Sequence, residues 1–224
     1  MAAVAAAIVS YASVSPTSQM WGRTVAHVPP GEIALTYDDG PNDGTTERLL
    51  DVLAKANARA TFFLIGRYVR RQPGLVRRIH QAGHVLGNHT DTHPNLVFAS
   101  SMRVRAEMGR CQHSIEDATG EAVQFFRPPF GMRRADTLSI ARSLQLTPVM
   151  WNVTCYDWKA TSAQAVLHHA DRQMRRNDAR GRGSILLLHD GGHIAPGAER
   201  RHTIEATRVL LSRNEARRLV TIGE

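Results

Sequence analysis

The amino-acid sequence predicts an α/β protein whose mainly parallel sheet closes, or nearly closes, into a barrel. Short apolar segments alternate with longer segments of helical periodicity from residue 33 onward, and this order favours parallel strands joined by right-handed crossovers. Clusters of polar residues follow the first, third, fourth, fifth and sixth apolar segments. Because active sites of α/β barrels gather at the carboxyl ends of the strands, a barrel brings these clusters into one pocket more readily than an open sheet does.

Each of the seven expected strands is a short apolar segment bounded by polar or turn-forming residues. They span residues 33–37, 60–65, 84–87, 124–126, 147–152, 184–188 and 219–222. A pattern of this kind places the ends of a strand only to within about two to four residues.

The intervening segments predict helices. Thr45 or Thr46 can cap a helix that buries the apolar side chains at 49, 50, 52 and 53. Pro73 suits the first turn of the next helix, and Gly83 suits its end. Longer helices are expected over residues 101–118, 134–144, 162–175 and 203–214.

Length and composition predict one globular domain. The chain has 224 residues, of which 42% are hydrophobic and 21% charged, as in an ordinary soluble protein. We expect the domain to span residues 30–224 and residues 1–29 to form an N-terminal extension. The first nine residues are apolar, but they are too short to cross a membrane and lack the basic start of a signal peptide. They are either the remnant of a signal or anchor, or a weakly helical tail.

The net charge of +8 is a further feature, and it could indicate nucleic acid, an anionic polymer or a membrane surface as a partner. Lys55 and Lys159 are the only lysines, and the densest arginine pairs lie on predicted helices, where a solvated helix face explains them. We therefore expect no nucleic-acid partner. Cys111 and Cys155 are the only cysteines, and the sequence neither requires nor excludes a disulfide between them.

Two adjacent aspartates, Asp38 and Asp39, end the first expected strand. Neighbouring side chains of a strand point to opposite faces, but Gly40 and Pro41 break the regular backbone and can turn both carboxylates toward one space. Two such charges repel unless a cation or a proton lies between them. One aspartate as metal ligand and the other as proton acceptor satisfies this requirement. The alternative is a turn that caps the following helix.

Two histidines, His89 and His93, follow the third expected strand. Imidazoles four residues apart can bind one ion from a helical turn or a tight loop, although most such pairs are surface or core residues. Together with one aspartate they form a three-ligand set. Such a set leaves a coordination position for water or substrate, as catalytic rather than structural sites do.

The chain resembles the polysaccharide deacetylases of the NodB-homology type, carbohydrate esterase family 4. The resemblance covers roughly residues 30–224 and rests on five ordered motifs. These are Thr36-Tyr37-Asp38-Asp39-Gly40-Pro41, His89-Thr90-Asp91-Thr92-His93, Arg127-Pro128-Pro129-Phe130-Gly131, Asp157-Trp158 and Leu187-Leu188-His189-Asp190. The resemblance implies a distorted (β/α) barrel with fewer than eight regular repeats, which agrees with about seven parallel strands.

The resemblance also implies a role for the residues of the first three motifs. Asp39, His89 and His93 are expected to bind a divalent ion, with Zn²⁺ favoured and Co²⁺, Ni²⁺ or Mn²⁺ as alternatives. Asp38 is expected to be the general base that takes a proton from the attacking water. Arg127 is expected to lie against Asp38 and to keep it ionised and oriented.

The remaining motifs are expected to supply the leaving-group side of the site. His189 is the expected general acid, and Asp157 is expected to pair with its imidazole so that it begins protonated. The backbone N–H of Phe130 is expected to stabilise the oxyanion, while Trp158 and Leu187 are expected to wall a slot for the acetyl methyl group. The family often has an aspartate at the position of Thr154, so the fourth motif is matched only in part. The hydroxyl of Thr90 is expected to steady the histidine turn.

These roles predict a hydrolase that removes N-acetyl groups from N-acetylglucosamine units of chitooligosaccharides or peptidoglycan. Removal of O-acetyl groups from xylan-like glycans, or of a formyl group from an amino sugar or lipid, would use the same chemistry. The rival from another class is a catalytically inactive carbohydrate-binding module. We expect a monomer that acts on an acetylated glycan and meets a membrane only through an N-terminal anchor. The cell envelope or the exterior is favoured over the cytoplasm.

Overall fold

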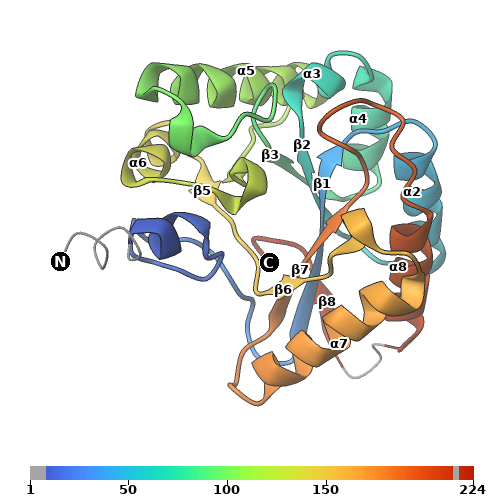
Figure 1. The fold of residues 1–224 in the computed structure, drawn as a ribbon. Helices are drawn as coiled ribbons and strands as arrows, with labels where there is room; N and C mark the ends of the chain where they lie inside the picture. Colours follow the sequence, from blue (N-terminus) through green and yellow to red (C-terminus); the bar gives the residue numbers. More distant parts are fainter. Residues whose placement is uncertain (1–8, 214–216) are drawn as a thin grey trace.

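The computed structural model describes residues 9–213 and 217–224, in which eight strands form one sheet (Figure 1). All the strand pairings are parallel, and the order is β5-β4-β3-β2-β1-β7-β6, with β8 also paired to β1. The strands are β1 (Glu32–Gly40), β2 (Thr61–Leu64), β3 (Val85–Asn88), β4 (Phe125–Phe126), β5 (Thr147–Pro148), β6 (Val153–Thr154), β7 (Ser184–His189) and β8 (Arg218–Val220).

The sheet is curled, which confirms the predicted distorted (β/α) barrel, but one expected strand was wrong. Residues 147–152 were expected to form a single strand, whereas β5 pairs with β4 at one edge of the sheet and β6 pairs with β7 at the other. Pro148 has no N–H to continue a ladder, and the chain after it crosses between the two edges. The crossing segment is bridged by the N-terminal part of the chain, since Val25 pairs with Val149.

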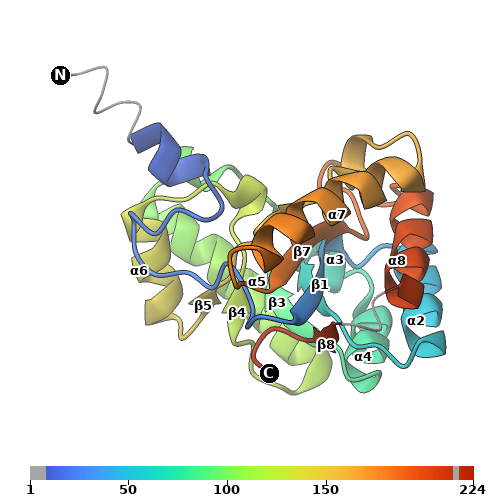
Figure 2. The same cartoon turned by 90° about the horizontal axis from the view of Figure 1, so that it is seen from below.

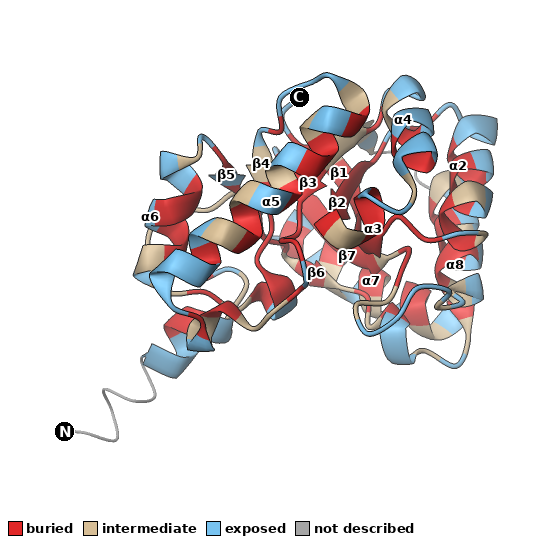
Figure 3. Cartoon of the chain, turned by 90° about the horizontal axis from the view of Figure 1, so that it is seen from above, coloured by how far each residue is buried: buried red, intermediate tan, exposed pale blue. Residues whose placement is uncertain are grey.

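The helices surround the sheet and turn their buried faces toward it (Figure 3). They are α2 (Thr45–Lys55), α3 (Gly66–Val69), α4 (Pro73–Gln81), α5 (Ser101–Thr119), α6 (Ala135–Ser143), α7 (Ala163–Asp178) and α8 (Arg201–Arg213), with short 3₁₀ turns η1 (Leu96–Phe98), η2 (Pro129–Gly131) and η3 (Asp157–Lys159). The predicted helices are therefore confirmed, except that the expected end of the last one at residue 214 lies outside the described residues, and α3 is an addition. Within residues 9–213 and 217–224, no helix has the length and apolar character needed to cross a membrane.

The expected threonine cap of α2 was wrong. Gly44 precedes the helix, and no side chain caps it. The hydroxyl of Thr46 instead accepts a hydrogen bond from the N–H of Asn42 at 2.9 Å and donates one to Asp190 at 2.5 Å. A hydroxyl engaged in a buried network is not free to cap its own helix. Cys111 and Cys155 are both buried and free, so no disulfide joins them.

Alternation along β1 separates two apolar cores and orients the functional residues. Ile33, Leu35 and Tyr37 pack into the core between the sheet and the helices, and the Tyr37 hydroxyl lies 2.9 Å from that of Thr207 on α8. Ala34 belongs to the smaller core inside the curled sheet. Because side chains two residues apart share a face, the interior face of β1 continues from Ala34 to Thr36 and Asp38. The strand therefore delivers Asp38 to the open end of the barrel interior.

The N-terminal segment packs against the domain. Residues 9–14 are helical, and the segment lies beside α6 in two perpendicular views (Figures 1 and 2). The guanidinium of Arg133 is buried and donates to the carbonyls of Ser15 and Ser18 at 2.8 Å and of Gly131 at 2.9 Å. The boundary expected at residue 29 stays a prediction. Apart from Val9, the nine residues interpreted as a remnant or a tail lie outside the described part of the chain.

Replacing Arg133 with methionine should destabilise the domain, because three buried or partly buried carbonyls lose their donor. Hydrogen bonds from a charged donor contribute roughly 1.5–3 kcal/mol each, while removing a buried cation recovers part of its desolvation cost. We expect a net loss of about 2–4 kcal/mol, which lowers the Tm of a domain of this size by about 5–12 °C.

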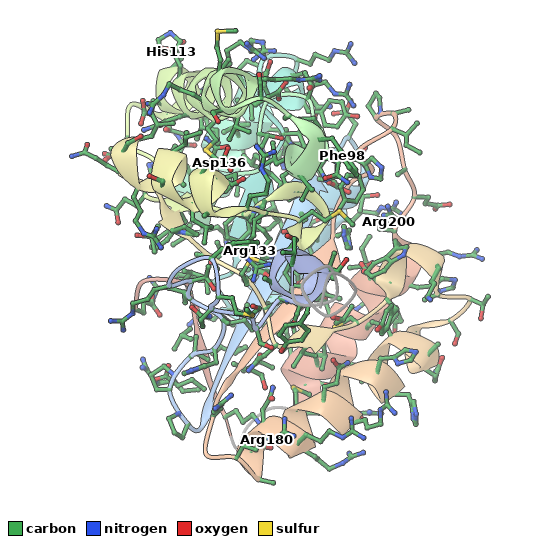
Figure 4. All side chains as sticks on the ribbon, turned by 60° about the vertical axis from the view of Figure 1, so that its left-hand side comes forward. Phe98, His113, Arg133, Asp136, Arg180 and Arg200 are labelled. Carbon is green, nitrogen blue, oxygen red and sulfur yellow. The ribbon has the colours of Figure 1, made fainter. Side chains whose placement is uncertain are left out.

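Thermal unfolding followed by circular dichroism measures this shift. Arg180→Met is the matched control, because Arg180 is exposed beyond the end of α7, whereas Arg133 lies beside the N-terminal helical turn (Figure 4). Equal Tm values for the two variants would show that the hydrogen bonds of Arg133 do not stabilise the domain.

Candidate active site

Asp38 and Asp39 point into the same space because the strand is interrupted at Asp39. Asp39 has a φ of 73°, and the register of β1 with β2 shifts between Asp38 and Gly40. A positive φ ends the alternation of side chains, so the second carboxylate turns to the face of the first. This turn was expected at Gly40 and Pro41, whereas it begins one residue earlier, at Asp39.

The two histidines and Asp39 come together at the ends of β1 and β3. Oδ1 of Asp39 lies 3.6 Å from Nε2 of His89 and 3.3 Å from Nε2 of His93. The three donor atoms lie within 4.8 Å of one another, and all three side chains are buried. In the part of the chain that the structure describes, this is the one group of three or more such residues that could hold a metal ion.

The chemistry of this donor set fits a cation. Nδ1 of His89 lies 2.8 Å from the carbonyl oxygen of Arg127, so Nδ1–H donates and the lone pair of Nε2 faces the other ligands. Burial and the neighbouring His89 lower the pKa of His93 to about 2, so this imidazole is neutral and able to donate its lone pair. Oδ1 of Asp39 is buried without a hydrogen-bond partner, as expected of an atom that needs a positive partner.

The backbone of the histidine turn is held in place by Thr90. Its hydroxyl accepts a hydrogen bond from the N–H of His93 at 3.1 Å, which confirms the expectation for this residue. Thr90 and His93 both have positive φ, as do Asp39, Phe130 and Tyr156 in the other loops around the site. Such conformations cost roughly 1–3 kcal/mol each and persist where the surrounding structure imposes them.

Arg127 fixes the orientation of Asp38. Its Nη1 lies 2.8 Å from Oδ1 of Asp38 and 2.7 Å from Oγ1 of Thr36, and its Nη2 donates to the carbonyl of Met150 at 3.0 Å. The guanidinium also lies over the ring of Phe63, 4.1 Å from its centroid. Each of these contacts is buried, so Arg127 is rigid and leaves Oδ2 of Asp38 facing the site, 3.7 Å from Nε2 of His89.

His189 and Asp157 form a second pair across the site, in which Asp157 is buried and His189 is partly buried. Nδ1 of His189 lies 2.8 Å from Oδ1 of Asp157, whose Oδ2 accepts hydrogen bonds from the N–H of His189 at 2.8 Å and the hydroxyl of Thr203 at 2.7 Å. Burial lowers the pKa of His189, but the charge of Asp157 and its hydrogen bond outweigh this effect and raise the pKa to about 9. The imidazole is therefore protonated at neutral pH.

A cavity of about 300 Å³ opens between these two groups. Its lining contains most of the predicted site residues, while Arg127 and Asp157 lie behind it. The lining residues are Asp38, Asp39, His89, His93, Phe130, Gly131, Trp151, Trp158, Leu187, His189, His193 and Arg200. Phe130 and Trp158 are about half exposed at the rim, whereas Leu187 is buried. The structure thus brings together the side chains predicted to bind the ion, to accept the proton and to donate it.

Four side chains at or near the cavity were given no role by sequence reasoning: Trp151, Asp190, His193 and Arg200. Asp190 is fully buried beside Gly40, and burial raises its pKa to about 7. Trp151 donates from Nε1 to Oγ1 of Thr154 at 2.9 Å. Thr154, which stands where the family often has an aspartate, therefore helps to hold Trp151 in the cavity wall. The sequence offered one indication for His193, because this histidine follows the fifth motif after two glycines. No sequence feature indicated Arg200.

Comparisons with known proteins agree with this geometry. Residues 26–149 match the sequence profile of the family described as polysaccharide deacetylase. The chain is 36% identical over 168 residues to a peptidoglycan-N-acetylglucosamine deacetylase of Bacillus cereus, and the match covers 73% of this chain and 58% of that protein. It is 38% identical over 160 residues to a chitooligosaccharide deacetylase of Rhizobium leguminosarum bv. trifolii, which covers 71% of both chains.

Solved structures give the same result over more of the chain. The Bc1960 peptidoglycan N-acetylglucosamine deacetylase superposes with a TM-score of 0.80 at 30% identity and covers 89% of this chain and 90% of its own. A pseudoenzyme of carbohydrate esterase family 4 from Bacillus anthracis superposes with a TM-score of 0.79 at 27% identity. The match covers 89% of this chain and 67% of that protein. By its matched profile, its relatives and its fold, the chain belongs to the polysaccharide deacetylase family.

Proposed function

We propose that this protein is a metal-dependent hydrolase that removes N-acetyl groups from N-acetylglucosamine units of a polysaccharide or oligosaccharide. The observation that carries the proposal is the convergence of an Asp–His–His group, a carboxylate and a protonated imidazole on one cavity. The names of the relatives support peptidoglycan and chitooligosaccharides as the substrate class.

Asp39, His89 and His93 would hold the metal ion, and Zn²⁺ suits one carboxylate and two imidazoles best. Co²⁺, Ni²⁺ and Mn²⁺ accept the same donors, so the ion that is bound depends also on availability. When bound, a divalent ion supplies a charge that polarises an amide carbonyl and acidifies a water molecule. The proximity of the three donors supports this assignment.

Asp38 would act as the general base. Its free oxygen faces the cavity, while Arg127 holds the other oxygen. It takes a proton from the water that attacks the acetyl carbon, and a base in this position typically contributes about 10²–10⁴-fold to the rate. The backbone N–H of Phe130 would stabilise the oxyanion that develops on the acetyl oxygen.

His189 would act as the general acid on the leaving-group side. Its imidazolium gives a proton to the sugar nitrogen as the carbon–nitrogen bond breaks, so that the amine leaves in neutral form. Asp157 keeps the imidazole protonated and oriented. Trp158 and Leu187 would enclose the acetyl methyl group, and Trp158 also packs edge-on against His189 with ring centroids 5.2 Å apart.

Replacing Asp157 with asparagine should move the alkaline limb of the pH–rate profile to lower pH. The carboxylate favours the protonated form of His189 and raises its pKa to about 9, so the neutral amide lowers that pKa. Loss of an opposite charge at contact distance shifts a pKa by roughly 1–3 units, and the acid is then deprotonated at correspondingly lower pH. The profile of kcat/KM measures the shift. Asp51→Asn, on the exposed face of α2, is the control, and an unmoved limb would remove Asp157 from this role.

Release of acetate from N-acetylglucosamine oligomers tests the proposed function directly. We expect release to stop after a chelator removes the metal and to return when Zn²⁺ is added. Hydrolysis that survives complete removal of metal would contradict the mechanism.

A panel of acetylated glycans separates this function from its rivals. It should contain chitooligosaccharides, peptidoglycan fragments and acetylated xylan. Preferred hydrolysis of xylan would favour the O-acetyl esterase. Binding without any hydrolysis would favour an inactive carbohydrate-binding module.

A further inference from the structure

A third histidine, His193, contacts the proposed metal site but belongs to none of the motifs. It lies on the loop between β7 and α8, and its ring stacks on that of His93 with centroids 4.4 Å apart and planes at 23°. The ring also meets that of Phe130 edge-on at 5.2 Å. Nδ1 of His193 is 3.6 Å from Oδ2 of Asp39, slightly beyond the length of a hydrogen bond.

The loop that carries His193 is held against the site from several sides. A Cβ atom on Gly191 would overlap the carbonyl oxygen of Asp39, so only glycine allows so close an approach. The carbonyl of Gly191 accepts a hydrogen bond from Nε of Arg200 at 2.8 Å, and that of Gly192 accepts one from the hydroxyl of Tyr68 at 3.1 Å. Arg67 donates to the carbonyl of His193.

The two oxygens of Asp39 therefore face different partners. Oδ1 faces Nε2 of His89 and of His93, whereas Oδ2 faces His193. A nitrogen placed against the outer oxygen favours the orientation in which the inner oxygen faces an ion. Partners of this kind orient metal ligands and tune metal affinity.

We propose that His193 is a positioning residue for the metal site, whose Nδ1 holds the outer oxygen of Asp39. The proposal rests on the proposed function, because it requires Asp39 to bind an ion. A role as a direct fourth ligand is disfavoured, since the donor atoms that lie mutually within 4.8 Å come from Asp39, His89 and His93. A purely structural core role is also disfavoured, because the side chain is 38% exposed and lines the cavity.

Two substitutions separate the two contacts that His193 makes. His193→Phe keeps a ring to stack on His93 but removes the nitrogen that faces Asp39. His193→Asn removes the ring but places an amide N–H close to the position of Nδ1. Ile194→Ala is the control, because Ile194 is the neighbouring residue and is 86% exposed. Circular dichroism and Tm of the metal-free proteins establish that each variant is folded.

Competition with a chromophoric chelator measures the Zn²⁺ affinity of each protein. We expect His193→Phe to bind Zn²⁺ about 10–100-fold more weakly than the wild type, His193→Asn to lie closer to the wild type, and Ile194→Ala to equal it. The absorption spectrum of the Co²⁺-loaded proteins should keep its shape, because the ligands are the same.

Three results would overturn the proposal. The first is equal affinity of His193→Phe and the wild type, which would leave the proposed function intact. The second is a Co²⁺ spectrum of His193→Phe that indicates the loss of a nitrogen ligand, which would make His193 a direct ligand. The third is a wild-type protein that binds no divalent ion, and this alone would also remove the proposed function.

Discussion

Asp38→Asn should lower kcat/KM for an N-acetylglucosamine oligomer by roughly 10³-fold. The amide has nearly the same size as the carboxylate and can keep contact with the neighbouring groups, but it cannot accept the proton of the attacking water. The loss should therefore be almost entirely in kcat, because binding of the glycan does not depend on that proton transfer. Steady-state assays of acetate release measure both constants.

Metal content decides whether Asp38 is the base or a ligand. Oδ2 of Asp38 is only 3.7 Å from Nε2 of His89, so a ligand role is a real alternative. Against it, Oδ1 of Asp38 is already held by Arg127, whereas Oδ1 of Asp39 is buried without a partner. We expect Asp38→Asn to retain one ion per chain. The control is Asp117→Asn, since the Asp117 side chain is 66% exposed on α5; loss of the ion from Asp38→Asn alone would assign Asp38 as a ligand.

Local patterns in the sequence were sufficient for much of the fold and for the convergence of polar residues at the strand ends, whereas the roles of the individual site residues came from the resemblance to the deacetylases. Alternation of apolar strands and amphipathic helices predicts a parallel sheet, and residues at strand ends then have to meet at one edge. This reasoning placed Asp38, His89 and His189 at one site although 151 positions separate the first from the last. The pairing of β1 with β7, which sets Asp38 opposite His189, is the contact that joins them.

Features that depend on tertiary contacts were beyond such patterns. The segment around Val149 looks like one apolar strand, yet it splits into β5 and β6 because the curled sheet needs a chain to cross between its edges. Similarly, an aspartate tolerates the positive φ of Asp39 but does not require it, so the residue type alone did not predict this conformation. His193 enters the site only because Gly191 packs on the backbone of Asp39 and Tyr68 holds the loop from α3.

His93→Ala should abolish activity because the protein loses the ion itself. Nε2 of His93 is the donor closest to Oδ1 of Asp39, at 3.3 Å, and without it one carboxylate and one imidazole remain. Two donors do not make a stable site for a divalent ion that prefers at least three protein ligands. We expect the variant to contain little Zn²⁺ after dialysis, as measured by elemental analysis, and to release acetate at the background rate.

The fold should survive this substitution, which separates loss of the ion from loss of the structure. The backbone at residue 93 has a φ of 61°, a conformation that histidine adopts more often than alanine, so alanine adds only a small strain. The Tm of metal-free His93→Ala should consequently stay close to that of the metal-free wild type. His113→Ala is the matched control, because the His113 side chain is 78% exposed on the outer face of α5 (Figure 4). If His93→Ala kept the zinc stoichiometry of this control, His93 would not be a ligand, and the three-donor site would have to be abandoned.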